Sequence, residues 1–233
     1  MDYQKKYIEL NPSLHVDDAP KKYAEIASLL GNLSSCKSIL DIACGAGRVT
    51  SLLKERFKTA HVVGIDVSEV MISKAKELNA GADIDWLVVD VFNFKPKQKF
   101  DLVVCADIIE HLKDDVAFLK QIKNFGREII LRVPMEDSFW NKVMKFLKIR
   151  DELNRTEKQY GHVHHYSKKS FESILEKSGL KVIDYQEFLI NKRRSWLLNE
   201  IVRILTKPLG FFSKELAIKL SGGFIVYRLT SGS

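Results

Sequence analysis

The alternation of short apolar runs with amphipathic stretches constrains the fold of this chain more than any other sequence feature. Runs of strand length are separated by stretches in which apolar residues recur at helical spacing. This order predicts βαβ units, and therefore a mostly parallel sheet with helices on both faces. We expect strands at 38–42, 61–65, 84–89, 100–106, 128–133, 181–190 and 223–230, and helices at 20–34, 49–56, 68–79, 114–125 and 167–177.

The predicted fold class is therefore α/β, with a Rossmann-like, doubly wound, mostly parallel seven-stranded sheet. A length of 233 residues is compatible with one domain over 1–233. Segments 134–166 and 191–222 fall outside the alternation, and we expect them to be helical insertions that form a lid. Because ligands of such sheets bind beyond the carboxyl ends of the strands, function should lie in the loops there.

Charge is distributed unevenly along the chain. The net charge is +7, and from Trp140 onward 18 Lys and Arg stand against 9 Asp and Glu, so the basic surplus belongs to the second half. This asymmetry indicates an anionic acceptor, a membrane surface or nucleic acid as partner, although a solvated lysine-rich face explains it equally well.

The termini and the cysteines bear on the cellular compartment. The first ten residues lack the apolar core of a signal peptide, and no run approaches the roughly 18 apolar residues of a membrane span. We therefore expect a cytoplasmic protein. Cys36, Cys44 and Cys105 have neither metal-ligand nor redox-motif spacing, which predicts reduced, structural thiols.

A glycine-containing turn follows the first expected strand and reads Asp-Ile-Ala-Cys-Gly-Ala-Gly over 41–47. Gly45 and Gly47 carry no Cβ, so they let the backbone approach a ligand. A dinucleotide fingerprint would have a third glycine in place of Thr50, and a phosphate loop would contain Gly-Lys-Ser/Thr. Neither phosphate-binding motif is present.

Acidic residues also follow the next two expected strands. Asp66 closes the second strand, at a distance along the chain where a carboxylate accepts hydrogen bonds from both ribose hydroxyls. Asp90 closes the third. Simpler roles exist, because Asp66 can cap the helix that begins at Ser68 and Asp90 can be a turn residue. Acids after three successive strands nevertheless predict a ligand that contains a ribose.

These segments together resemble the class I S-adenosylmethionine-dependent methyltransferases. The turn at 41–47 is similar to their first motif, Gly-Ile-Asp-Val-Ser to the second and Val-Val-Asp-Val to the third, and the likeness covers residues 20–190. It implies S-adenosylmethionine as cofactor and S-adenosylhomocysteine as product. It places around the cofactor Asp41, Ala43, Gly45, Gly47, Asp66, Val67, Met71, Asp90, Val91 and Asp107, with the hydrophobic core as the alternative location for Met71.

The fourth expected strand runs into Asp107-Ile-Ile-Glu110-His111, which resembles the fourth motif of a subfamily that includes quinone-precursor O-methyltransferases. Methyl acceptors lie at this position in that subfamily. Methyl transfer to a hydroxyl requires in-line alignment and removal of a proton. We therefore predict His111 as the base, with Glu110 and His165 as further catalytic residues.

Three more histidines lie between Tyr160 and Tyr166, just before the helix at 167–177. If the loop after the fifth strand folds over the cofactor, side chains from two segments can bind a divalent cation such as Mg²⁺, which would acidify a coordinated hydroxyl. Asp107-x-x-Glu110-His111 resembles the Glu-x-x-Glu-His cluster of metal-assisted methyltransferases, with Asp107 in place of the first Glu. A loop cap and cofactor packing are the alternatives. The predicted ligands are Glu110, His111, His164 and His165.

Two amphipathic segments are expected on the acceptor side. In 134–166, apolar residues at helical spacing with lysines between them either pack on the sheet or line an acceptor pocket. Segment 195–220 mixes aromatic and basic residues, which suits peripheral contact with a membrane, the protein's own core or a dimer surface. The sequence leaves these alternatives open.

We predict that the chain transfers a methyl group from S-adenosylmethionine to an oxygen of a small-molecule acceptor, such as a quinone precursor, a lipid-linked compound or a sugar. The alternatives are RNA 2′-O-methylation and a non-catalytic S-adenosylmethionine-binding protein. The sequence contains no evident RNA-binding module, so nucleic acid is the second choice as partner.

Overall fold

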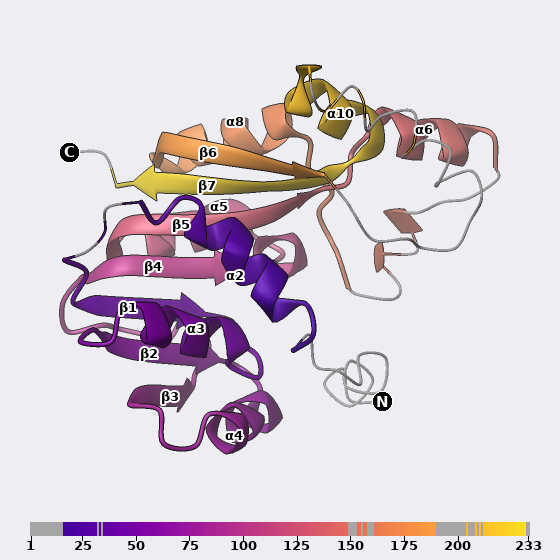
Figure 1. The fold of residues 1–233 in the computed structure, drawn as a ribbon. Helices are drawn as coiled ribbons and strands as arrows, with labels where there is room; N and C mark the ends of the chain where they lie inside the picture. The colour runs from indigo at the N-terminus through magenta and orange to yellow at the C-terminus, as the bar shows by residue number, and fades with distance from the viewer. Residues whose placement is uncertain are drawn as a thin grey trace.

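A seven-stranded sheet runs through the computed structural model, which describes residues 16–31, 33, 35–148, 153–154, 156–157, 161–189, 204, 208, 210 and 212–231 (Figure 1). The strand order is β3-β2-β1-β4-β5-β7-β6. The first five strands pair in parallel, and β7 lies antiparallel between β5 and β6. The strands are β1 (Ser38–Ile42), β2 (His61–Asp66), β3 (Ile84–Val88), β4 (Phe100–Ala106), β5 (Gly126–Met135), β6 (Lys181–Leu189) and β7 (Gly223–Thr230).

Helices cover both faces of the sheet, with α2 and α3 on one face and α5 and α8 on the other (Figure 1). Within the described residues, no helix combines the length and apolar character needed to cross a bilayer. The helices are α2 (Ala19–Ala27), α3 (Arg48–Arg56), α4 (Glu69–Leu78), α5 (Asp115–Ile122), α6 (Phe139–Phe146), α8 (Lys168–Ser178) and α10 (Lys214–Ser221), and η1 (Ile109–His111) is a short 3-10 helix.

The side chains of the strands form two hydrophobic cores, one on each face of the sheet, because successive side chains of a strand point to opposite faces. Ile39 and Leu102 belong to the core beneath α2 and α3, and their neighbours Leu40 and Val103 belong to the other core. All four side chains are fully buried. A sheet buried on both faces explains why these strands read as nearly continuous apolar runs.

The predicted fold class is confirmed, and all seven strands lie within a few residues of their expected positions. The expected helix at 20–34 is wrong at its end, because α2 stops at Ala27. There the Ser28 hydroxyl donates a hydrogen bond to the Glu25 carbonyl at 2.7 Å, and Gly31 adopts a positive φ of 41°. Such side-chain bonds compete with helix continuation. Of the expected insertions, 134–166 contains α6, and most of 191–222 lies outside the described residues.

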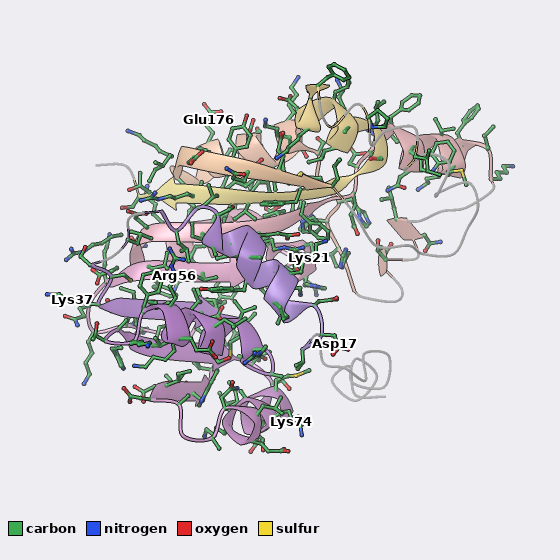
Figure 2. The ribbon with its side chains drawn as sticks, viewed as in Figure 1. Asp17, Lys21, Lys37, Arg56, Lys74 and Glu176 are labelled. Carbon is green, nitrogen blue, oxygen red and sulfur yellow. The ribbon has the colours of Figure 1, made fainter. Side chains whose placement is uncertain are left out.

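A buried ion-pair network holds α2 on the sheet. Arg132 of β5, only 3% exposed, donates from Nε to Glu25 of α2 at 2.6 Å and also pairs with Asp107 after β4. Lys22 of α2 pairs with the same Asp107 at 2.9 Å. The Arg132 guanidinium lies 3.8 Å from the ring centroid of Phe224 on β7. Lys21, labelled on α2 in Figure 2, also reaches Glu25, at 3.5 Å.

Trp86 fills the space that two glycines leave beside β2 and α3. Gly64 is the direct partner of Trp86 in the β2–β3 register, and a Cβ built on Gly64 would lie 2.6 Å from the indole. A Cβ on Gly47, which caps α3 with φ 77°, would lie 2.3 Å from the same ring and 2.9 Å from Ala75. Gly47 is therefore required by packing as well as by its backbone conformation.

Replacing Gly47 with alanine should lower the free energy of unfolding by about 2–4 kcal/mol, which combines overpacking against Trp86 with the strain of a left-handed backbone. Urea denaturation of the purified variant measures this loss. The matched control is Gly81→Ala, because Gly81 also has a positive φ of 88° but has no atom within 4 Å of a built Cβ. The free energy of unfolding of Gly81→Ala should fall by only about 1–2 kcal/mol. Equal losses in the two variants would contradict the packing role.

Candidate functional site

The end of β1, which contains Asp41, and the turn that follows it with two glycines lie at the carboxyl edge of the sheet. Asp41 is 2% exposed, and the Thr50 hydroxyl donates a 2.6 Å hydrogen bond to its Oδ2. Burial raises the pKa of Asp41 to about 7, against the lowering effect of that hydrogen bond. Ala43 and Gly45 both adopt positive φ, of 57° and 55°. A non-glycine residue in this conformation is strained, which is typical of ligand-binding turns.

Asp66, at the end of β2, connects this turn to the next one. Its Oδ2 accepts from the Gly45 amide at 2.9 Å, and its Oδ1 accepts from the Ser68 amide at 2.8 Å. Burial raises the pKa of Asp66, and these amides oppose the rise. A Cβ on Gly45 would meet no atom within 4 Å, so the turn faces open space beside the carboxylate. Because each carboxylate oxygen has further acceptor capacity, Asp66 can also bind ribose hydroxyls.

The remaining residues predicted at the cofactor occupy different environments. Val67 is 62% exposed directly beside Asp66, which leaves an apolar surface open to a planar ring. Asp90 is exposed, and its Oδ1 accepts from the Phe92 amide at 2.8 Å, so it forms a turn two residues beyond β3. Val91 is half-buried against the core. Met71 is 6% exposed and lies in the first turns of α4, where core packing accounts for it.

Asp107 takes part in the ion-pair network under α2. Burial raises its pKa, but Arg132 and Lys22 outweigh that effect and hold the pKa well below the ordinary range. Asp107 is therefore a carboxylate whose oxygens already face two cations. Its positive φ of 54° turns the chain sharply into η1. A role at the cofactor stays a prediction for this residue.

η1 presents Glu110 and His111 at the carboxyl end of β4. Glu110 is 1% exposed, and burial together with the Asp107 charge raises its pKa well above the ordinary value. Burial and neighbouring His162 lower the pKa of His111 to about 4. These surroundings therefore favour the protonated form of Glu110, and His111 is an uncharged imidazole at neutral pH. Among the described residues, neither Oε2 of Glu110 nor Nδ1 of His111 has a hydrogen-bond partner.

A second carboxylate, Glu136, gathers two imidazoles next to His111. Glu136 follows β5 directly, and its Oε2 lies 2.9 Å from Nδ1 of His162 and 2.8 Å from Nδ1 of His165. Burial raises the pKa of Glu136, but these hydrogen bonds lower it to about 2. An ionised carboxylate only accepts hydrogen bonds, so both Nδ1 atoms carry the proton. The His111 and His162 rings meet edge to face, with centroids 4.8 Å apart.

Three of the four predicted metal ligands fall into two side-chain groups, which share His162, a residue not predicted as a ligand. One group contains Glu110, His111 and His162, and the other contains Glu136, His162 and His165. His164 lies outside both, because its Nε2 lies 3.3 Å from the Lys113 carbonyl and its ring stacks on Tyr166. Mg²⁺ favours oxygen ligands in near-octahedral geometry, and imidazole-rich sites suit softer divalent ions. The donor set therefore does not fit Mg²⁺.

Sequence reasoning missed Glu136 and His162 as site residues. Glu136 stands in a segment expected to be an insertion, although an acid directly after the fifth strand repeats the pattern seen after the first three. His162 belongs to the noted histidine cluster, but spacing alone did not show which of its members turn inward. The structure thus joins η1, the end of β5 and the chain before α8 into one cluster of two carboxyl groups and three imidazoles.

Comparisons with known proteins agree with this architecture. Residues 16–185 match the family model described as a methyltransferase domain. The chain is 30% identical over 132 residues to trans-aconitate 2-methyltransferase of Escherichia coli O139:H28, a match that covers 55% of this chain and 52% of that protein. The chain thus spans about half the length of the curated relatives it matches.

Two solved structures share the fold at low sequence identity. An S-adenosylmethionine-dependent methyltransferase from Clostridium acetobutylicum matches with a TM-score of 0.59 at 16% identity, covering 91% of this chain and 92% of that one. Phosphoethanolamine N-methyltransferase 2 of Haemonchus contortus, in complex with S-adenosyl-L-methionine, matches with a TM-score of 0.64 at 18% identity, covering 91% and 53%. Given the family match over most of its length and the strand order of its sheet, the chain belongs to the class I S-adenosylmethionine-dependent methyltransferase family.

Proposed function

We propose that this protein binds S-adenosylmethionine beyond the ends of β1, β2 and β3 and transfers its methyl group to an oxygen of a small-molecule acceptor. The observation that carries the proposal is the placement of Asp41, Asp66 and the open Gly45 turn on the same sheet edge as the imidazole cluster. When bound, the cofactor supplies an electrophilic methyl group on a sulfonium. The residues of this chain then position the two reactants and remove one proton from the acceptor.

Cofactor binding would rest first on Asp66, whose carboxylate is held by the Gly45 and Ser68 amides. Ribose hydroxyls would donate to the same oxygens. Exposed Val67 offers an apolar surface for an adenine, with Asp90 and Val91 at the end of the next strand. The open space above Gly45 leaves room for the methionine part of the molecule, next to Ala43 and Asp41.

An imidazole would remove the proton from the acceptor. His111 is uncharged at neutral pH because burial lowers its pKa to about 4, so its nitrogen can accept a proton. His165 donates its Nδ1 hydrogen to Glu136, which leaves Nε2 as the basic nitrogen of that ring. Burial raises the pKa of Glu110 and favours its protonated form, which can donate a hydrogen bond to an acceptor oxygen.

The acceptor is proposed to be a quinone precursor, a lipid-linked compound or a sugar. The related enzyme from Escherichia coli is named for methylation of trans-aconitate, which adds a small carboxylic acid to the candidates. Transfer of radiolabel from S-adenosylmethionine to a panel of these compounds and to RNA tests the proposal. Label on RNA alone would favour RNA methylation, and the absence of label on any compound despite cofactor binding would favour a binding protein.

Asp66→Asn should weaken S-adenosylmethionine binding by roughly 100-fold, since a hydrogen bond to a charged group contributes about 1.5–3 kcal/mol. Calorimetric titration with S-adenosylmethionine measures the change, and thermal unfolding verifies that the variant is folded. Asp85→Asn is the matched control, because Asp85 is an exposed acid on neighbouring β3. Equal affinity of Asp66→Asn and wild type for S-adenosylmethionine would show that this carboxylate does not bind the cofactor.

His111→Asn should lower the rate of methyl transfer by about 10²–10⁴-fold, the usual contribution of a positioned base, and leave cofactor affinity unchanged. In wild type, kcat/KM should show a limb near pH 4, where protonation of His111 removes the base, and His111→Asn should lack this limb. His61→Asn, which replaces an exposed histidine at the start of β2, is the control. A limb near pH 4 that persists in His111→Asn would assign the base elsewhere.

A further inference from the structure

Two helices at one end of the molecule expose large apolar side chains to solvent. α6 and α10 contact each other and lie side by side beyond the sheet (Figure 1). Figure 2 shows side chains projecting outward from both helices. The exposed apolar residues, here called the α6–α10 surface, are Phe139 (60% exposed), Phe146 (84%), Leu147 (54%), Phe212 (90%) and Leu216 (44%).

Each helix buries only one or two of its side chains fully. Met144 is the buried residue of α6, and Ala217 and Ile218 are the buried residues of α10. Phe139 and Phe146 of α6, and Phe212 just before α10, are thus exposed to solvent instead of packed in the core. Large apolar patches are rare on monomeric proteins unless they bind another molecule.

The same two helices carry an excess of positive charge. Exposed lysines border the apolar residues on α6, in the residues after it and on α10. Two of the described acids at these helices pair with lysines. Asp137 pairs with Lys142 at 2.8 Å, and Glu215 pairs with Lys168 of α8 at 3.3 Å. The exposed lysines are Lys142, Lys145, Lys148, Lys214 and Lys219.

The sheet register fixes the α6–α10 surface next to the imidazole cluster. Met135, the last residue of β5, pairs with Gly223, the first residue of β7, so α6 begins where α10 ends. A Cβ on Gly222 would lie 3.0 Å from the Met135 carbonyl, which shows how closely the two segments approach. Glu136 lies between β5 and α6, and therefore at the border of this surface.

We infer that the α6–α10 surface binds the interface of an anionic phospholipid bilayer. Aromatic and aliphatic side chains on the outer faces would enter the boundary between headgroups and acyl chains, and the bordering lysines would face the anionic headgroups. Lysine-rich charge next to apolar side chains is the pattern by which amphipathic helices lie in a membrane surface, and it differs from the charge-poor centre of a protein interface. The inference stands apart from catalysis, since it concerns where the protein resides.

Cosedimentation with vesicles tests the inference without an acceptor or turnover. Vesicles of phosphatidylcholine containing roughly one third phosphatidylglycerol should bind the full chain, and pure phosphatidylcholine vesicles should bind it about tenfold less, because lysines are attracted to anionic lipid. Phe146→Asp/Phe212→Asp should lower binding to the anionic vesicles by about tenfold or more, since it places charge where the surface enters the bilayer.

Leu78→Asp/Leu87→Asp is the control, because both side chains are exposed apolar residues, at 48% and 42%, and lie on α4 and β3, at the opposite edge of the sheet from β7 and β6. It should bind vesicles like wild type. Equal binding of both double variants, or no binding of wild type to anionic vesicles, would overturn the inference. A dimer in light scattering that Phe146→Asp/Phe212→Asp abolishes, without vesicle binding, would instead assign the surface to a second copy of the chain.

Discussion

The buried guanidinium of Arg132 is the interaction on which the geometry of the site depends. It joins α2, β5 and the turn after β4 through Glu25 and Asp107, and the ring of Phe224 packs against it. A buried charge without its partner costs about 3–5 kcal/mol, so each group in the network requires the others. Since Asp107 is the residue at which the chain turns into η1, the network also positions Glu110 and His111.

The pKa values of the two carboxyl groups in the imidazole cluster are shifted in opposite directions by their surroundings. Glu136 accepts hydrogen bonds from two imidazoles and is ionised, whereas burial and the charged Asp107 raise the pKa of Glu110 and favour its protonated form. The lowered pKa of His111 leaves its imidazole uncharged at neutral pH. Acid and base functions at neutral pH generally arise when neighbouring groups are given different pKa values in this way. The cluster therefore contains a donor, an acceptor and an orienting anion within one small region.

Local patterns predicted the fold well, and the residues proposed to bind the cofactor were also chosen from local patterns. Strand alternation, the turn at Gly45 and Gly47, and Asp66 at the end of β2 all depend on residues close together in the chain. The contacts that sequence reasoning missed join distant residues, such as Arg132 with Glu25 and Glu136 with His162. These pairings depend on strand order and on which side chains of a loop turn inward, and neither is encoded by local spacing.

The antiparallel course of β7 has a consequence for how acceptor preference can change in this fold. Because β5 ends where β7 begins, the segments after β5 and before β7 start and finish at one edge of the sheet, while Asp41, Asp66 and the glycine turn belong to strands on the other side of β4. With the acceptor and cofactor sites proposed above, substitution or exchange of both segments would alter the acceptor side without changing the register of β1, β2 or β3. The two proposed sites thus depend on separate parts of one continuous sheet.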